Sequence, residues 1–163
     1  MKQIASFEVN HDYIVPGMYV SRIDGDITTY DLRTRRPNAG DYMDNLTMHS
    51  VEHLFATYVR NSALGGQVLY FGPMGCRTGF YLLLRDVPQE AAYRLVLETL
   101  EQVVSHQGRV FGAERTACGN YQNLDTAAAV AECRAYLPAL LARGMDLAYP
   151  TEAPELDASP SAT

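Results

Sequence analysis

The sequence predicts an α+β fold in which an antiparallel sheet packs against helices in a two-layer sandwich. Two observations predict it. Runs of β-branched and aromatic residues occur in pairs joined by short turns, and helical segments follow them without regular strand–helix alternation. The length of 163 residues fits a single domain with a core of its own. We expect this domain to cover residues 1–149.

The first half of the chain predicts a hairpin, a helix and a second pair of strands. Strands at 18–23 and 27–32 flank Asp24-Gly25-Asp26, and Asp-Gly is typical of tight hairpin turns. From about residue 44 to residue 62, apolar residues recur at three- and four-residue steps, which predicts a helix. Two further strands are expected after this helix, at 67–71 and 79–85.

The second half predicts two helices and a tail. One helix is expected to begin at Pro88, because proline is favoured at the first helical position, and to end at Gln107. The other follows Asp125, which is a good N-cap, and runs to Gly144. Residues 150–163 contain few large apolar side chains, so we expect a disordered C-terminal tail.

Composition and charge narrow the class of protein. The formal charge of −6 disfavours general binding to nucleic-acid phosphates. No uncharged apolar run is long enough to span a bilayer, and the first residues lack the apolar segment of a signal peptide. Three scattered cysteines do not suggest a disulfide framework. We therefore expect a cytoplasmic protein with neither a membrane nor a nucleic acid as its partner.

The strongest local motif is His49-Ser50-Val51-Glu52-His53, an H-x-x-E-H sequence in the predicted helix. His49 and His53 are four residues apart, so their side chains share one helix face and can bind the same metal ion. Glu52 lies near that face, where a carboxylate can move protons at a metal-bound ligand. The same motif occurs in inverzincin peptidases. An amphipathic helix that merely carries two surface histidines is the alternative.

The three cysteines favour different roles. Cys118 is the best candidate for a third ligand, because it lies in an expected loop and a thiolate suits a transition metal bound by imidazoles. Three protein ligands leave one coordination position open for a substrate. Cys133 falls in register with apolar residues of the last helix, which indicates a buried structural thiol. Cys76 lies in a turn beside Arg77, where a cation favours a reactive thiolate.

Together these motifs resemble the S-ribosylhomocysteine lyase family, the enzymes of autoinducer-2 synthesis in bacterial quorum sensing. The resemblance covers nearly the whole chain except its tail. It rests on five segments that follow the order and spacing of the family: Ser6-Phe7-Glu8-Val9-Asn10-His11, Asp31-Leu32-Arg33 with Pro37-Asn38, His49-Ser50-Val51-Glu52-His53-Leu54-Phe55-Ala56, Pro73-Met74-Gly75-Cys76-Arg77-Thr78-Gly79-Phe80-Tyr81, and Cys118-Gly119.

The resemblance implies a lyase that cleaves the thioether of S-ribosylhomocysteine to homocysteine, for the activated methyl cycle, and 4,5-dihydroxy-2,3-pentanedione. It also implies a homodimer with active sites at the interface, and one divalent metal ion per subunit, natively Fe²⁺ with Zn²⁺ or Co²⁺ as substitutes. Residue by residue, it implies that His49, His53 and Cys118 bind the metal. Glu52 and Cys76 would be the acid/base pair. Five further residues would bind the substrate: Ser6, His11, Arg33, Arg60 and Tyr81.

This reaction agrees with the chemistry of these residue types. A thioether C–S bond eliminates only when a carbonyl acidifies the adjacent C–H, so the sugar carbonyl must first migrate from C1 to C3. A metal ion with an open position polarises carbonyl groups. Two bases on different sides of the sugar then move the protons, and homocysteine leaves by β-elimination. No organic cofactor is needed.

Three segments depart from the usual sequence of the family. Asn10 replaces an aspartate, Thr34-Arg35-Arg36 replaces apolar residues or cysteine, and Tyr70-Phe71-Gly72 replaces Asp-Ile-Ser. They concern the homocysteine end of the pocket and leave the metal and proton-transfer residues intact.

Two other function classes stay open on the residues alone. One is a metal-dependent hydrolase or peptidase with the same helix motif, although such peptidases usually take a distant carboxylate as the third ligand. The other is a non-catalytic protein with a structural metal site, although a closed site needs a fourth ligand.

Overall fold

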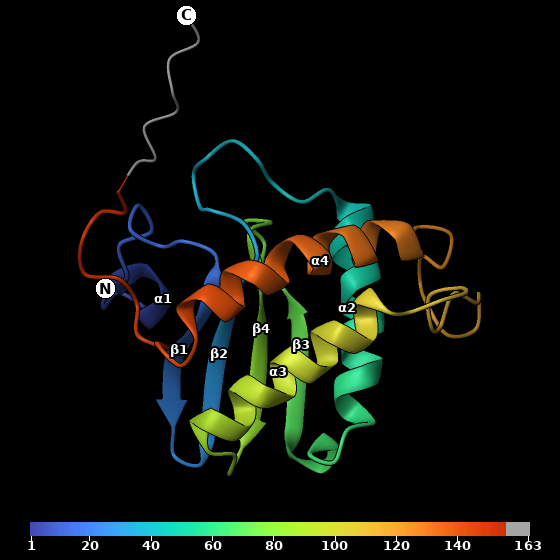
Figure 1. The fold of residues 1–163 in the computed structure, drawn as a ribbon, viewed down its shortest axis with the longest axis horizontal. Helices are drawn as coiled ribbons and strands as arrows, with labels where there is room; N and C mark the ends of the chain where they lie inside the picture. The colour runs from blue at the N-terminus through green and yellow to red at the C-terminus, as the bar shows by residue number, and fades with distance from the viewer. Residues whose placement is uncertain (156–163) are drawn as a thin grey trace, which may run out of the picture.

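The computed structural model describes residues 1–155 and has an antiparallel sheet of four strands at its centre (Figure 1). The strands are β1 (Gly17–Asp24), β2 (Ile27–Arg33), β3 (Val68–Pro73) and β4 (Gly79–Arg85). Each strand is antiparallel to its neighbours, and the order across the sheet is β1-β2-β4-β3. All four expected strands are found, and each boundary lies within two residues of its prediction. The α+β class and the antiparallel sheet are therefore confirmed.

Three long helices and one short helix complete the described part of the chain. They are α1 (Ala5–Glu8), α2 (Asn45–Arg60), α3 (Gln89–Val104) and α4 (Thr126–Arg143), with a short 3-10 turn η1 (Gly65–Gln67). Figure 1 shows α3 and α4 lying across one face of the sheet, with α2 next to β3. Phe55 of α2 stacks on Phe71 of β3 with a centroid distance of 4.3 Å, and Phe71 stacks on Phe80 of β4. These aromatic contacts join α2 to the sheet.

The first hairpin depends on the turn that the sequence predicts. Asp24 pairs with Ile27, and Gly25 between them has a φ of +61°, which glycine adopts at little cost. The register of β1 shifts between Val20 and Arg22, so one residue of β1 bulges from the ladder.

Two aspartates fix the beginnings of the helices that carry or flank the predicted site. The Asp44 carboxylate accepts a hydrogen bond of 2.7 Å from the Thr47 N–H at the start of α2. At the start of α4, Asp125 accepts from the N–H groups of Ala127 and Ala128. Each carboxylate satisfies backbone donors that the first turn leaves unpaired.

Three details of the helices differ from the expectation. Pro88 is the N-cap of α3 with an extended ψ of 145°, so the helix begins at Gln89, not at Pro88. The helix ends at Val104, three residues before the expected Gln107, because the chain turns at Ser105 and His106 bonds back to Val103. The sequence analysis missed α1, a single turn without a capping side chain.

The segment after α4 turns back along β1. The Val20 N–H donates a hydrogen bond of 2.8 Å to the Leu147 carbonyl, so this segment covers part of the outer edge of β1. Residues 150–155 contain no helix or strand. The rest of the predicted tail, residues 156–163, lies outside the described residues. No helix within residues 1–155 has both the length and the apolar character that a membrane crossing requires.

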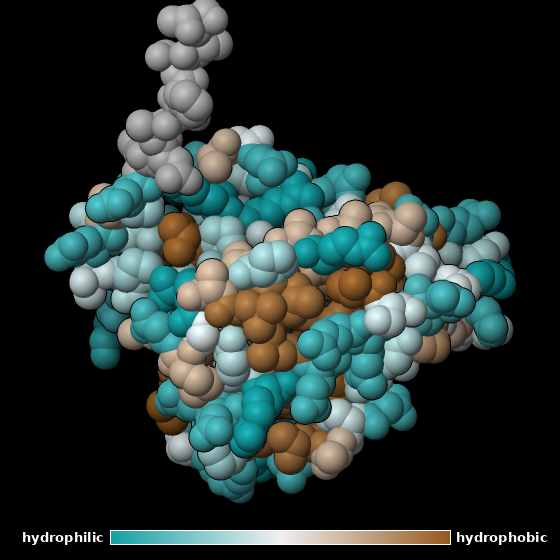
Figure 2. All heavy atoms as spheres, in the orientation of Figure 1, coloured by the Kyte–Doolittle hydropathy of each residue, from teal (hydrophilic) through white to brown (hydrophobic). Residues whose placement is uncertain are grey.

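One face of the molecule shows an apolar patch between α3 and α4. Figure 2 shows brown surface along the line where these two helices pack, with mostly polar side chains around it. Leu141 of α4 is among the exposed large apolar residues. Neither helix carries a residue of the predicted site, so the predicted site is built from other elements.

Candidate active site

The three predicted metal ligands lie together beside the first half and the middle of α2. His49 and His53 occupy successive turns of this helix, and their ring centroids are 4.6 Å apart. Cys118 reaches them from the loop between α3 and α4, and its Sγ lies 3.4 Å from His49 Nε2. One ligand atom of each side chain lies within 4.8 Å of the others. Residues that are far apart in the sequence thus form one cluster of two imidazoles and a thiol.

Backbone carbonyls of the same loop orient both imidazole rings. His49 Nδ1 lies 2.8 Å from the Asn123 carbonyl oxygen, and His53 Nδ1 lies 2.8 Å from that of Phe111. A carbonyl oxygen only accepts, so each Nδ1 donates its hydrogen and each Nε2 keeps a free lone pair. Metal-binding histidines are typically held in this way. The donor set of two imidazoles and one thiol fits a divalent transition metal.

Side chains of α2 and the loop also bond to one another near Phe111. The Tyr58 hydroxyl hydrogen-bonds His106 Nδ1 at 2.8 Å, and His106 Nε2 lies 2.9 Å from the Arg109 carbonyl. Gly112 has a φ of +70°, and a Cβ there would lie 3.3 Å from His53 Nδ1. Both the backbone conformation and the close approach favour glycine. These residues were not predicted, because no sequence motif marks a backbone carbonyl or the residues near it.

Glu52 lies beside the cluster without joining it. It is half-buried and lines a hollow of about 270 Å³ that His49 and Pro73 also line. Among the residues from 1 to 155, no fourth histidine, cysteine or acid belongs to the cluster. A carboxylate next to a three-ligand cluster suits proton transfer at a group bound there.

A second hollow, of about 330 Å³, contains Cys76 together with four of the five residues expected to bind substrate. They come from the N-terminal segment, β2 and β4, and are Ser6, His11, Arg33 and Tyr81. Pro73 lines this hollow as well as the hollow of Glu52. His49 of the cluster and Cys76 therefore line two hollows that share Pro73 as a lining residue.

Arg33, and not the adjacent Arg77, is the cation next to Cys76. Arg33 Nη1 lies 3.8 Å from Cys76 Sγ. The Arg77 guanidinium instead lies over the Tyr42 ring, 5.6 Å from its centroid. The sequence favoured Arg77 because the two residues are neighbours in the chain, but Arg77 adopts a φ of +64° in the turn and its side chain stacks on Tyr42. Arg33 reaches the thiol from 43 residues away.

A buried ion pair with Asp31 stabilises the positive charge of Arg33. Arg33 Nη2 lies 2.6 Å from Asp31 Oδ2, and both side chains are almost completely buried. Burial by itself lowers the pKa of Arg33, but the charge of Asp31 and its hydrogen bonds raise that pKa by more. Because Asp31 and Arg33 are two residues apart on β2, they lie on the same face of the sheet. Arg33 therefore stays protonated beside the thiol.

Comparison with known proteins points to one family. A family model described as S-Ribosylhomocysteinase (LuxS) matches residues 4–144, a range that contains every predicted site residue. The chain belongs to the S-ribosylhomocysteinase (LuxS) family.

Several LuxS relatives bear the name S-ribosylhomocysteine lyase. The protein of Finegoldia magna is 42% identical over 142 residues, which cover 84% of this chain and 90% of that protein. The protein of Clostridium beijerinckii is 44% identical over 131 residues, with 77% and 82% covered. The protein of Phocaeicola vulgatus is 39% identical over 160 residues, with 93% and 99% covered.

Arg60 is the one residue expected to bind substrate that lines neither of these hollows. It ends α2, and its guanidinium donates to the carbonyls of Val68 and Leu69, each at 3.3 Å.

Cys133 is buried in α4, as the sequence predicted. Burial, and to a lesser extent the charge of Glu132, raises the pKa of Cys133 to about 12, so this thiol stays protonated.

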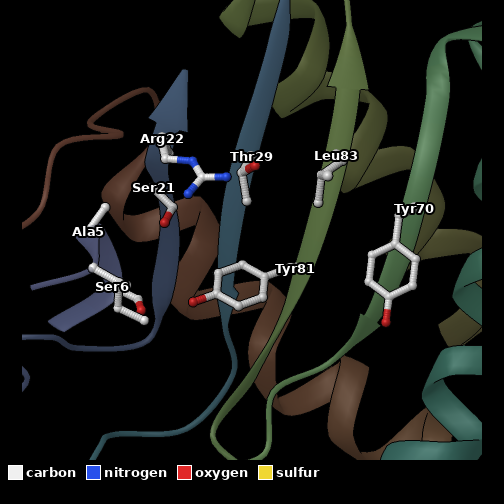
Figure 3. Close-up of a pocket in the computed structure, with 9 residues that line it drawn as sticks. Ala5, Ser6, Ser21, Arg22, Thr29, Tyr70, Tyr81 and Leu83 are labelled. Carbon is white, nitrogen blue, oxygen red and sulfur yellow. The ribbon is translucent and has the colours of Figure 1, made fainter. Parts of the chain in front are cut away.

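The sheet face that carries Arg33 and Tyr81 has a further hollow, of about 440 Å³ (Figure 3). Ser6 and Tyr81 line it as well as the hollow of Cys76. Figure 3 shows the Tyr81 hydroxyl pointing toward α1, where Ser6 lies, and Tyr70 at the opposite side on β3. This hollow was not predicted from the sequence.

Tyr70, which lines this hollow, lies close to Gly72 of the same strand. The Tyr70 ring lies over Gly72, where an added Cβ would come within 2.1 Å of the Tyr70 hydroxyl oxygen. No side chain larger than hydrogen fits under this ring unless Tyr70 moves. The glycine at position 72 therefore accommodates the Tyr70 ring in this position.

Proposed function

We propose that this LuxS-family protein cleaves S-ribosylhomocysteine to homocysteine and 4,5-dihydroxy-2,3-pentanedione. The observation that carries the proposal is that Pro73 lines two hollows, one beside the cluster of His49, His53 and Cys118 and the other around Cys76. The printed name of the relatives, S-ribosylhomocysteine lyase, supports the same substrate.

We propose one divalent metal ion per subunit, held by His49, His53 and Cys118, with Fe²⁺ as the native ion and Zn²⁺ or Co²⁺ as substitutes. The free Nε2 atoms and the nearby thiol support this ligand set. When bound, such an ion supplies a Lewis acid next to a sugar carbonyl. On this proposal the H-x-x-E-H segment of α2 is a metal-binding helix, and the sheet and helices form a two-layer sandwich within one catalytic domain of residues 1–149.

The chain itself has to move protons at several carbons of the sugar. Migration of the carbonyl from C1 to C3 removes a proton from one carbon and returns one to its neighbour in each step. Elimination then removes the proton next to the C3 carbonyl, the C–S bond breaks, and the homocysteine thiolate takes up a proton. Glu52 suits the transfers near the cluster, and Cys76 suits those in the adjoining hollow, because the two groups come from different elements.

The remaining hollow residues suit substrate binding. Ser6, His11, Arg33 and Tyr81 offer hydrogen-bonding groups around Cys76 and would hold the hydroxyl groups of the sugar. Arg60 bonds to β3 within its own subunit, so we propose that it approaches a substrate only across a homodimer interface. Three unpaired cysteines fit a cytoplasmic location.

The assay that tests the proposal measures thiol release. The metal-loaded protein is incubated with S-ribosylhomocysteine, and free homocysteine is titrated with a chromogenic thiol reagent against a substrate-free blank. We expect release that stops when the metal is chelated and resumes when it is restored. A metal-loaded protein that releases no thiol would contradict the proposal, and hydrolysis of a peptide substrate would favour the hydrolase alternative.

A further inference from the structure

The segment that follows α4 reaches the sheet face opposite α3 and α4. Its Leu147 carbonyl bonds to β1, and two residues later the half-buried Tyr149 stacks on Tyr19. The two ring centroids are 4.8 Å apart and the ring planes differ by 13°. Tyr149 lies outside the part of the chain that the family model matches, residues 4–144. The stacking fixes the ring and so directs its hydroxyl.

The Tyr149 hydroxyl donates a hydrogen bond of 2.8 Å to Asp31 Oδ2. Asp31 is fully buried and accepts two further hydrogen bonds, from Arg33 Nε to Oδ1 and from Arg33 Nη2 to Oδ2. Burial, and then the Asp31 carboxylate, raise the pKa of Tyr149 above its usual range, so the hydroxyl remains a donor. The buried carboxylate is thus held by two residues, and only one of them is a cation.

The same network continues to the thiol. Arg33 Nη1 donates a hydrogen bond of 2.7 Å to Thr78 Oγ1 and lies 3.8 Å from Cys76 Sγ. Thr78 Oγ1 also lies 3.1 Å from this sulfur. Each of the three guanidinium nitrogens of Arg33 therefore has a partner, and its orientation depends on Asp31.

We propose that Tyr149 is a positioning residue for Cys76, acting through Asp31 and Arg33. The hydroxyl compensates part of the Asp31 charge and holds the carboxylate in the plane where it pairs with Arg33. Without this donor, the negative charge of Asp31 acts more strongly on its surroundings, and Arg33 is less firmly directed toward Thr78 and the sulfur. Both effects disfavour a thiolate at Cys76. The proposal rests on the proposed function only in taking Cys76 as an acid/base group.

The charged and titratable groups around Cys76 explain why the electrostatic environment of this thiol depends on Arg33. His11 and Tyr81 line the same hollow, and the guanidinium of Arg77 is directed to the Tyr42 ring. Arg33 is thus the nearest permanent cation that the structure places against the sulfur, at 3.8 Å. A change in how firmly Asp31 holds Arg33 therefore alters the electrostatic environment of the thiol directly.

The test compares Tyr149→Phe with the parent protein by the rate at which iodoacetamide alkylates Cys76, followed by mass spectrometry of the Cys76 peptide. Phenylalanine keeps the ring and its stacking on Tyr19 and removes only the hydroxyl. Since a hydrogen bond to a charged group is worth about a tenfold change in an equilibrium, we expect alkylation at neutral pH to slow about three- to tenfold. The midpoint of its pH profile should rise, and kcat for thiol release should fall.

Tyr19→Phe is the matched control, because it removes a hydroxyl from the other ring of the same stack. That hydroxyl donates its hydrogen bond to the Val15 carbonyl and not to Asp31. We expect it to leave the alkylation profile of Cys76 unchanged. A folded Tyr149→Phe protein with the parent profile would overturn the proposal, even if its thermal stability were lower. Alkylation needs no substrate, so this result is independent of whether the protein cleaves S-ribosylhomocysteine.

Discussion

Glu52 is the side chain whose chemistry is easiest to remove without changing its shape. Glu52→Gln keeps the size of the group that lines the hollow with His49 but removes its ability to take up a proton. We expect kcat for thiol release to fall about 10²- to 10⁴-fold, the usual loss for a positioned acid/base group. The measurement is homocysteine release together with metal content, which should not change. A variant with the parent rate would show that Glu52 takes no part in proton transfer.

Two cysteines offer a matched test of the ligand assignment. Cys118 lies 3.4 Å from His49 Nε2, whereas Cys133 is buried in α4 and belongs to the core. Cys118→Ala should lose most of its bound metal on dialysis, because two imidazoles remain from a three-ligand site. Cys133→Ala should keep the parent stoichiometry. The check is elemental analysis of both dialysed proteins, and equal metal content would rule out Cys118 as a ligand.

At the residue scale, the sequence predicts partners only where spacing carries the information. His49 and His53 are found together because four residues make one helical turn. The approach of Arg33 to Cys76 is not predictable in this way, because 43 residues separate them and the contact depends on how β2 and the β3–β4 turn meet. Sequence proximity instead pointed to Arg77, whose side chain lies over Tyr42.

The helices depend on N-cap residues, and each cap can be tested by a single substitution. At the start of α2, Asp44→Ala removes the acceptor of the Thr47 N–H and should lower the free energy of unfolding by about 1 kcal/mol. Asp44→Asn is the matched control, since asparagine caps helices about as well. Denaturant titration of the three proteins at neutral pH is the measurement. Equal stability of the alanine variant and the parent would show that the cap has no effect.

The same cap predicts a dependence on pH. Hydrogen bonds from the side chain and then the backbone N–H of Thr47 lower the pKa of Asp44 in the folded protein. Its contribution to stability is therefore complete above the unfolded pKa, which is about 3.9 for aspartate, and is lost as the pH falls through the lower folded value. Asp44→Asn has no group to titrate there. Its stability should fall less steeply than that of the parent below about pH 4, and parallel curves would contradict the assignment.

At the element scale, capping and periodicity account for what was predictable. Asp44 and Asp125 mark the beginnings of α2 and α4 correctly, because their carboxylates pair with the first N–H groups. The helix start predicted at Pro88 is one residue too early, because proline is sterically suited both to the N-cap and to the first helical position. The single turn of α1 has neither a capping side chain nor enough residues for a periodic pattern.

For the whole molecule, we expect bound metal to contribute to stability. The ligands come from α2 and from the loop before α4, so an ion would tie together parts of the chain that are 65 or more residues apart, as His53 and Cys118 are. Metal at 100 times its Kd would add about 2.7 kcal/mol. Chelation should lower the Tm in a thermal melt, and acidification should release the metal because its ligands must be deprotonated. In Cys118→Ala the chelator should have little effect, and an equal drop in Tm there would point to a different site.

The two edge strands of the sheet, β1 and β3, affect how copies of the chain can associate. Exposed strand edges are templates for β-augmentation, in which a second chain extends the hydrogen-bond ladder. Here the Leu147 carbonyl accepts a hydrogen bond from one N–H of the β1 edge, and the Arg60 guanidinium donates to two carbonyls of β3. Each edge is thus partly occupied by groups of the same chain. A strand that docked on either edge would first have to displace these bonds, which disfavours association by extension of the sheet.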